Sequence, residues 1–136
     1  MKSKLATTIM TKNVVCVSTE QSLLDVKHIY EKKNFHHHIP VTKNEKLVGM
    51  ISLVDFMYNI AGAGISDDHI IYKKLKVKDI MTSHPFYLTS NATIEDVAKV
   101  LAKGKYHAIP IVEDDKIKGI VSTADIIQFF LNDNYQ

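Results

Sequence analysis

The chain has 136 residues, a hydrophobic content of 46% and a formal net charge of +2 at pH 7. This length and apolar content exclude a disordered chain and suit one compact domain, or two small units that share a core. Because the charge is nearly balanced and the lysines are scattered, we expect neither nucleic acid nor a membrane as a partner. No segment is apolar enough for a signal peptide or a bilayer span, and Cys16 is the only cysteine, so we expect a cytoplasmic location.

The first half of the chain predicts the element order β-α-β-β-α. After a lead-in with one helical turn, residues 14–17 are apolar and β-branched and predict a short strand. Residues 22–33 carry apolar side chains at helical spacing, and the Ser-x-x-Asp that begins them fits a capping box. Residues 39–52 predict a hairpin with a charged turn, followed by a second helix that should end near Gly62 or Gly64.

The second half repeats this order after a joint at residues 65–77, in which residues 65–69 are polar and irregular and residues 70–75 could form a helical turn. A strand is expected at 86–88, a helix at 93–103, a hairpin at 109–121 and a last helix from Ser122.

Three residue types recur at one constant separation in the two halves: Pro40 and Pro110, Gly49 and Gly119, and Asp55 and Asp125. A single register without a gap fits all three pairs, which indicates a duplicated unit. We therefore divide the chain into two domains, residues 1–68 and 69–136. Each is marginal in size alone, so we expect a mixed α/β (α+β) fold in which two three-stranded sheets pack with pseudo-two-fold symmetry and leave two related clefts.

Gly49 and Gly119 lie inside predicted strands. A glycine there marks a bulge or the close approach of another group. A ligand is one interpretation, and a kink of the sheet or tight helix packing is the other; the sequence leaves both open.

The Ser52-x-x-Asp55 and Ser122-x-x-Asp125 motifs also have two interpretations. Their spacing describes a helix capping box, which is the commoner role. With a glycine three residues earlier, however, the motif places a hydroxyl and free backbone N–H groups at a helix N-terminus, where phosphate binds well. The aspartate one turn later could accept both hydroxyls of a ribose.

His36, His37 and His38 precede the first hairpin, and His107 has the matching place in the second half. Because neighbours on a strand point to opposite faces, a metal site is the weaker interpretation. These side chains could instead donate to phosphate oxygens or lie in a solvated loop.

Catalytic signatures are missing from the sequence. It contains no P-loop, no dinucleotide fingerprint and no nucleophile elbow. We therefore expect no enzymatic activity, no catalytic residues and no catalytic cofactor.

The order Met-Thr, short strand, capped helix, Ile-Pro hairpin and Gly-x-x-Ser-x-x-Asp, found twice, resembles the CBS domain (cystathionine β-synthase domain). Two tandem copies resemble a CBS pair, or Bateman module, over nearly the whole chain. The resemblance implies a regulatory module that binds an adenosine-containing nucleotide, AMP in the first place, in the cleft between the two repeats. It also implies that the module signals to an unknown protein partner in trans.

The resemblance further implies a set of ligand-binding residues: Asp55 and Asp125 for ribose; Ser52, Ser122, His37, His38 and His107 for phosphate; Val15, Cys16, Phe86 and Tyr87 for adenine. The family often has arginine at the basic positions, where this chain has histidine. Ala108 also removes the second basic candidate from the second repeat. We therefore expect two unequal clefts and a phosphate affinity that depends on pH.

CBS pairs often dimerise through their helices, so a homodimer is also implied. Apolar side chains that could serve it, or could instead fill the core of the chain itself, are Phe56, Met57, Phe129, Phe130 and Leu131. Two alternatives remain: an interaction module whose clefts bind no ligand, and a metal sensor that uses the histidine run.

Overall fold

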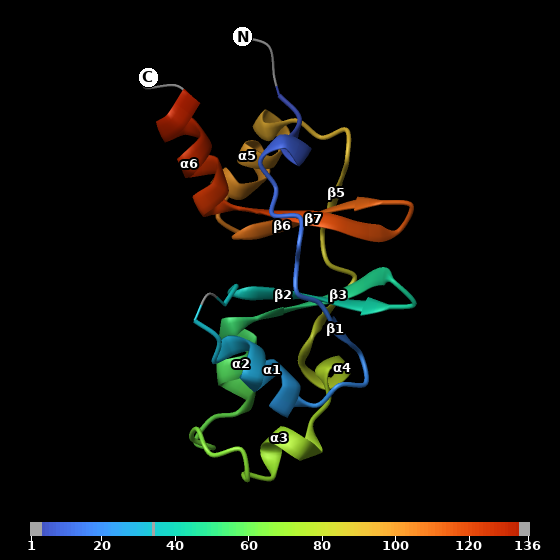
Figure 1. The fold of residues 1–136 in the computed structure, drawn as a ribbon, viewed down its shortest axis with the longest axis vertical. Helices are drawn as coiled ribbons and strands as arrows, with labels where there is room; N and C mark the ends of the chain where they lie inside the picture. The colour runs from blue at the N-terminus through green and yellow to red at the C-terminus, as the bar shows by residue number, and fades with distance from the viewer. Residues whose placement is uncertain (1–3, 34, 134–136) are drawn as a thin grey trace. The chain divides into compact units, whose positions relative to one another are not determined.

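The computed structural model describes residues 4–33 and 35–133. The chain divides into two compact units. We name the units by their place along the chain. The inner unit is Val15–Pro85, and the outer unit combines Met1–Val14 with Phe86–Gln136. The N-terminal segment, in which the first repeat begins, therefore packs with the second repeat (Figure 1). The domain boundary between residues 68 and 69 stays a prediction about the sequence repeats.

The inner unit has a mixed sheet with its helices on one side (Figure 1). Strand β1 is parallel to β2, and the antiparallel partners of β3 are β2 and β4. The parallel pair requires a crossover, which α1 supplies. The elements are β1 (Val17–Ser18), α1 (Leu23–Tyr30), β2 (His38–Lys43), β3 (Lys46–Ser52), α2 (Leu53–Asn59), α3 (Ile71–Lys74), α4 (Val77–Ile80) and β4 (Thr82–Ser83).

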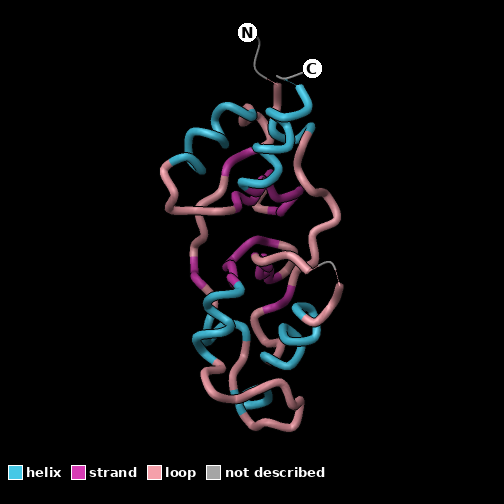
Figure 2. Tube along the Cα trace, turned by 90° about the vertical axis from the view of Figure 1, so that its left-hand side faces the viewer, coloured by secondary structure: helices cyan, strands magenta, loops and turns pink. Residues whose placement is uncertain are grey.

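The outer unit repeats this plan, as the alternation of strand and helix in Figure 2 shows. Strand β5 is parallel to β6, and β6 is antiparallel to β7. Thr11 takes the place of β4, because it forms an antiparallel bridge to Ile120 of β7. The elements are η1 (Ala6–Thr8), β5 (Leu88–Thr89), α5 (Ile94–Ala102), β6 (Ala108–Glu113), β7 (Lys116–Ser122) and α6 (Thr123–Asp133).

The two hairpins have the same turn and the same irregularity. Asn44 and Glu45 both have positive φ, as do Asp114 and Asp115, which is the backbone of a two-residue type I′ turn. The register also shifts at matching places, after Val41 in one hairpin and after Ile111 in the other. The predicted hairpins and the mixed α/β class are thus confirmed.

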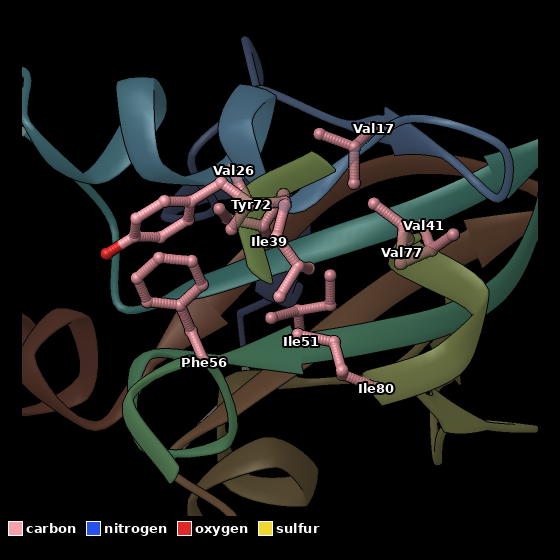
Figure 3. Packing of buried hydrophobic residues seen from close by; sticks show 10 residues of the cluster. Val17, Val26, Ile39, Val41, Ile51, Phe56, Tyr72, Val77 and Ile80 are labelled. Atoms are coloured by element: carbon pink, nitrogen blue, oxygen red, sulfur yellow. The ribbon is translucent and has the colours of Figure 1, made fainter. Parts of the chain in front are cut away.

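Each unit has its own apolar core between its sheet and its helices. In the inner unit the side chains of Val17, Val41 and Ile51 are buried against the helices (Figure 3). The rings of Phe56 and Tyr72 stack with centroids 6.4 Å apart. Burying each such side chain contributes about 1.5–3 kcal/mol. The outer core is equivalent and contains Ala6, Ile94, Val97, Leu101, Ile109, Ile111, Val121 and Ile126.

Several predicted elements differ at their boundaries. The strands predicted at 14–17 and 86–88 begin only at Val17 and Leu88, where pairing with β2 and β6 starts. Helix α2 ends at Asn59, before the predicted glycines. Helix α4 and strand β4 were not predicted, because each has four residues or fewer and so leaves no periodic pattern in the sequence.

The capping box predicted at the start of α1 is wrong. Ser22 is the N-cap residue, but its side chain makes no capping hydrogen bond. The carboxylate of Asp25 instead accepts a hydrogen bond from the Gln21 amide at 3.2 Å. A neighbouring donor thus competes for the carboxylate, which spacing alone does not reveal.

Within the described residues, none of the helices has the length and apolarity that a bilayer crossing requires.

Candidate functional site

The two strand glycines are explained by a methionine that packs on each of them. A Cβ on Gly49 would collide with the Sδ of Met81, and one on Gly119 would lie 2.5 Å from the Sδ of Met10. The carbonyl of Thr11 would lie only 2.8 Å from the second of these Cβ atoms. The group that approaches each glycine is therefore the Met-Thr segment of the chain, which forms the adjoining edge of the sheet.

In the inner unit, Ser52 and Asp55 form a reciprocal capping box where β3 passes into α2. The Asp55 N–H donates to Ser52 Oγ at 3.0 Å, and the Ser52 N–H donates to Asp55 Oδ2 at 3.4 Å. Both residues are half-buried. Because a carboxylate has about four acceptor sites, Asp55 retains capacity on its other oxygen, and the Ser52 hydroxyl can still donate its proton.

The outer unit has the same junction between β7 and α6. The Asp125 N–H donates to Ser122 Oγ at 3.1 Å, and the Ser122 N–H donates to Asp125 Oδ2 at 2.8 Å. The second hydrogen bond is shorter than its counterpart in the inner unit, so Asp125 is held more firmly. The capping interpretation of both motifs is therefore correct, and it leaves polar capacity for a ligand.

A third capping box, which is not part of a Gly-x-x-Ser-x-x-Asp motif, can be compared with these two. Thr93 and Asp96 at the start of α5 exchange hydrogen bonds of 3.0 and 2.9 Å. The Thr93 backbone N–H, followed by its side chain, holds the pKa of Asp96 below its usual value of 3.8. Geometry alone therefore does not distinguish a ligand-binding box from a plain cap.

The histidine before each hairpin is joined to the start of the following helix through its backbone. The carbonyl of His37 accepts from the Leu53 N–H at 2.7 Å and from the Tyr30 hydroxyl at 3.1 Å. The carbonyl of His107 accepts from the Thr123 N–H at 3.0 Å. Both histidines therefore lie beside the N-terminus of the helix that carries the aspartate, with exposed side chains.

Asp55 also influences a tyrosine of its own unit. Burial and the negative charge of Asp55 raise the pKa of Tyr30 far above its ordinary value. Tyr30 therefore stays protonated and acts only as a neutral hydrogen-bond donor, here to the His37 carbonyl.

The residues assigned to adenine precede the first strands instead of belonging to them. Val15 and Phe86 are exposed, and Cys16 is half-buried, which raises the pKa of its thiol. Phe86 stacks on Tyr106 with centroids 5.3 Å apart and an interplanar angle of 16°. Sequence reasoning missed Tyr106, and its place directly before His107 was the available signal.

Asp125 lines a groove of about 520 Å³ in the outer unit. The other lining residues are Lys4, Thr8, Ile9, Gln128, Phe129 and Asn132. Sequence reasoning missed this groove, although Asp125, Gln128, Phe129 and Asn132 have the spacing of one helix face. The groove gives a ligand room beside the carboxylate.

Tyr87 lines a second groove of about 430 Å³, also in the outer unit. Glu113, Asp114 and Asp115 lie on its wall. Because these acidic side chains repel phosphate, this groove does not suit a nucleotide's anionic end.

The predicted site residues thus belong to the two units as follows. Val15, Cys16, His37, His38, Ser52 and Asp55 lie in the inner unit, and Phe86, Tyr87, His107, Ser122 and Asp125 lie in the outer unit. Within each unit the serine, the aspartate and the histidine backbone converge on one helix N-terminus. Their contact with a ligand stays a prediction.

The sequence profile of the CBS domain matches this chain twice, at residues 6–62 and 77–132. The chain belongs to the CBS domain family. The two matches make it a CBS pair, and such pairs are regulatory modules that are generally non-catalytic.

Known CBS proteins resemble the chain over most of its length. An uncharacterized protein of Methanocaldococcus jannaschii is 31% identical over 122 residues, which are 88% of this chain and 41% of that protein. The crystal structure of the Arabidopsis thaliana CBS-pair protein CBSX2 in complex with AMP has a TM-score of 0.79 at 25% identity, and the alignment covers 96% of this chain and 98% of that one.

Another CBS pair, that of protein MJ0100 in complex with 5′-methylthioadenosine and S-adenosyl-L-methionine, has a TM-score of 0.78. Its identity of 24%, over 95% of this chain and 97% of that chain, establishes a shared fold. The chain spans between 16% and 45% of the length of the curated relatives that it matches.

Proposed function

We propose that this CBS pair is a regulatory module that binds an adenosine-containing nucleotide, AMP in the first place, and transmits its binding to a protein partner. The observation that carries the proposal is the Ser-x-x-Asp capping box, present in both units at a strand-to-helix junction and half-buried. The AMP complex of CBSX2, a CBS pair of nearly the same extent, supports the choice of ligand.

The aspartates would bind the ribose. Asp55 and Asp125 each use Oδ2 within their capping box, which fixes the side-chain rotamer before a ligand arrives. The remaining acceptor sites can take hydrogen bonds from the two ribose hydroxyls. A carboxylate that is already oriented loses little conformational entropy on binding, so these contacts add efficiently to affinity.

The phosphate would bind at the helix N-terminus beside the histidines. Ser52 and Ser122 keep a hydroxyl proton to donate, and the first turns of α2 and α6 add the favourable end of the helix dipole. His37, His38 and His107 would donate from their imidazoles. This set has no arginine, so it lacks the bidentate donor geometry that a guanidinium offers to phosphate.

A thermal-shift panel tests the proposed ligand class. The tag-free protein would be heated with AMP, ADP, ATP, S-adenosylmethionine, 5′-methylthioadenosine, and GMP as the control. A ligand present at 100 times its Kd stabilises the fold by about 2.7 kcal/mol. We expect the melting temperature to rise with AMP and not with GMP, whereas no shift with any adenosine compound at millimolar concentration would contradict the proposal.

Self-association through the exposed helix faces is a second proposed property. Met57 and Tyr58 of α2 are 58% and 82% exposed, and Ile127 of α6, which matches Met57 in the repeat, is 55% exposed. Exposed apolar side chains at matching positions of both repeats suit the surface of a homodimer. We expect light scattering to give the mass of a dimer, and Met57→Lys with Ile127→Lys to give a folded monomer. A monomeric parent protein would overturn this proposal.

A further inference from the structure

Helix α1 carries a buried lysine that joins it to the segment between α2 and α3. Lys27 is only 5% exposed, and among the residues that the structure describes it is the one charged residue that is buried. Its Nζ lies 2.7 Å from Glu31 Oε2 and 2.5 Å from Asp67 Oδ1, and 5.5 Å from the ring centroid of Tyr72. The lysine therefore holds two carboxylates from different elements in fixed positions.

A histidine completes this cluster at the surface. His28 Nε2 lies 2.9 Å from the second carboxylate oxygen of Asp67, Oδ2. One ligand atom each from His28, Glu31 and Asp67 lie within 4.8 Å of one another. His28 and Glu31 are one helical turn apart on α1, so both side chains project from the same face.

The charges and donor atoms of the cluster suit a divalent transition metal. Two carboxylates face one ammonium, so with a neutral imidazole the cluster keeps one negative charge unbalanced. An imidazole nitrogen and carboxylate oxygens are ligands that Zn²⁺ accepts, with water in the fourth position. Lys27 uses one oxygen of each carboxylate, which leaves Glu31 Oε1 and Asp67 Oδ2 for an ion, and Asp67 Oδ2 already contacts His28.

The spacing requires a small rearrangement. Bonds of about 2.1 Å place two ligands of a tetrahedral zinc ion about 3.4 Å apart. The His28 and Asp67 atoms are hydrogen-bonded at 2.9 Å, so the ion would take the place of the proton between them and part them slightly, while the imidazole carries its proton on Nδ1 in the other tautomer. The Glu31 side chain is half-exposed and can rotate toward the ion. Lys27 would remain as the outer hydrogen-bond donor that orients both carboxylates.

We propose that His28, Glu31 and Asp67 form a binding site for a divalent transition-metal ion of the Zn²⁺ type. Asp67 lies in the stretch between the two CBS matches, which end at residue 62 and resume at 77. The bound ion would fasten this stretch to α1 within the inner unit. The site is independent of the proposed nucleotide contacts, and His36 and His37 belong to no three-ligand group among the residues that the structure describes.

Metal titration of tag-free, EDTA-treated protein tests this site. Zn²⁺ would be titrated in competition with a chromophoric chelator, and Co²⁺ would report the coordination geometry by its visible absorption. We expect one ion per chain, and at least a tenfold loss of affinity in His28→Ala and in Asp67→Asn, as even outer-shell changes cost about 10–100-fold. The matched control is the triple variant His36→Ala, His37→Ala and His38→Ala, which should bind as the parent does.

A second readout follows the segment that the ion would fasten. Trypsin cleavage after Lys73 and Lys74 should slow when Zn²⁺ is added to the parent protein, and should not change in His28→Ala. His28 is exposed, so its replacement leaves the fold intact even where Asp67→Asn unfolds the segment. Absence of binding at 1 mM Zn²⁺, retention of the ion in His28→Ala, or its loss in the triple variant would each overturn the proposal.

Discussion

Asp125 and Ser122 hold each other through two reciprocal hydrogen bonds, of 3.1 Å to the serine hydroxyl and 2.8 Å to the carboxylate. The pair lies where strand β7 ends and helix α6 starts, so this capping box both shapes the backbone and orients a carboxylate. The same capping box recurs at Ser52 and Asp55. A cap and a ligand site are therefore compatible roles for these residues.

The packing of Met10 on Gly119 predicts a strong effect of a single methyl group. Gly119→Ala should destabilise the protein by about 1–3 kcal/mol, because its Cβ would meet the Met10 sulfur and the Thr11 carbonyl. Gly49→Ala should cost less, since the nearest carbonyl, that of Thr82, is 3.1 Å away instead of 2.8 Å. Urea unfolding measures both, and equal stability of Gly119→Ala and the parent would contradict this packing.

A double variant separates the two contacts of Gly119. Replacing Met10 by alanine in the Gly119→Ala background removes the sulfur and leaves the Thr11 carbonyl. We expect the loss of stability in the double variant to be smaller than the sum of the two single losses. Strict additivity would indicate that the sulfur does not contact the new methyl group.

The capping box of α5 predicts a dependence of stability on pH. The pKa of Asp96 is lowered in the folded protein, chiefly by the Thr93 N–H, so its contribution is fully present above the ordinary value of 3.8. That contribution is lost as the pH falls through the lowered pKa. Asp96→Asn should therefore melt at a lower temperature than the parent at pH 7, with the difference shrinking below pH 4. A difference that grows in acid would contradict the assigned hydrogen bonds.

The histidines predict a contribution to affinity that is specific to the phosphate. A hydrogen bond to a charged group contributes about 1.5–3 kcal/mol, and adenosine has no phosphate to accept one. His37→Gln with His38→Gln, or His107→Gln, should therefore weaken AMP binding and leave adenosine binding as in the parent. Isothermal titration calorimetry of both ligands measures the two affinities, and equal AMP affinity in the parent and in both variants would exclude these donors.

The repeat order and the hairpins could be predicted from the sequence because they depend on local patterns. The apolar alternation that ends at Ser52 and the turn at Asn44 specify a hairpin without reference to the rest of the chain. The same holds for the helical spacing that follows Thr93. The family match confirms the resemblance that these patterns carried.

Long-range partners could not be predicted in this way. Met10 lies near the start of the first repeat, yet its neighbour Thr11 pairs with Ile120 of the second. Nothing local to Met10 indicates that partner, because the choice depends on which sheet edge is free. Asp67 is a similar case: it lies in an irregular segment, forty residues from Lys27, and only the fold brings them together.

The site residues could be predicted only in part, because some belong to local motifs and others come together only in the fold. The Ser-x-x-Asp motifs are local, and their capping geometry follows from spacing. The groove beside Asp125 also needs Lys4 and Thr8, which come from the other end of the chain. These residues lie beside α6 only because the N-terminal segment packs with the second repeat in the outer unit.

Calorimetric titration of AMP into Asp125→Asn, Asp55→Asn and Asp96→Asn tests the central claim most directly. All three changes remove the charge from a capping box, but only the first two remove a proposed ribose contact. We expect at least one of Asp125→Asn and Asp55→Asn to weaken AMP binding by about 10- to 150-fold, the equivalent of one hydrogen bond to a charged group, and Asp96→Asn to bind as the parent does. Equal AMP affinity in all four proteins, or an equal loss in Asp96→Asn, would contradict the claim that the paired capping boxes bind a nucleotide.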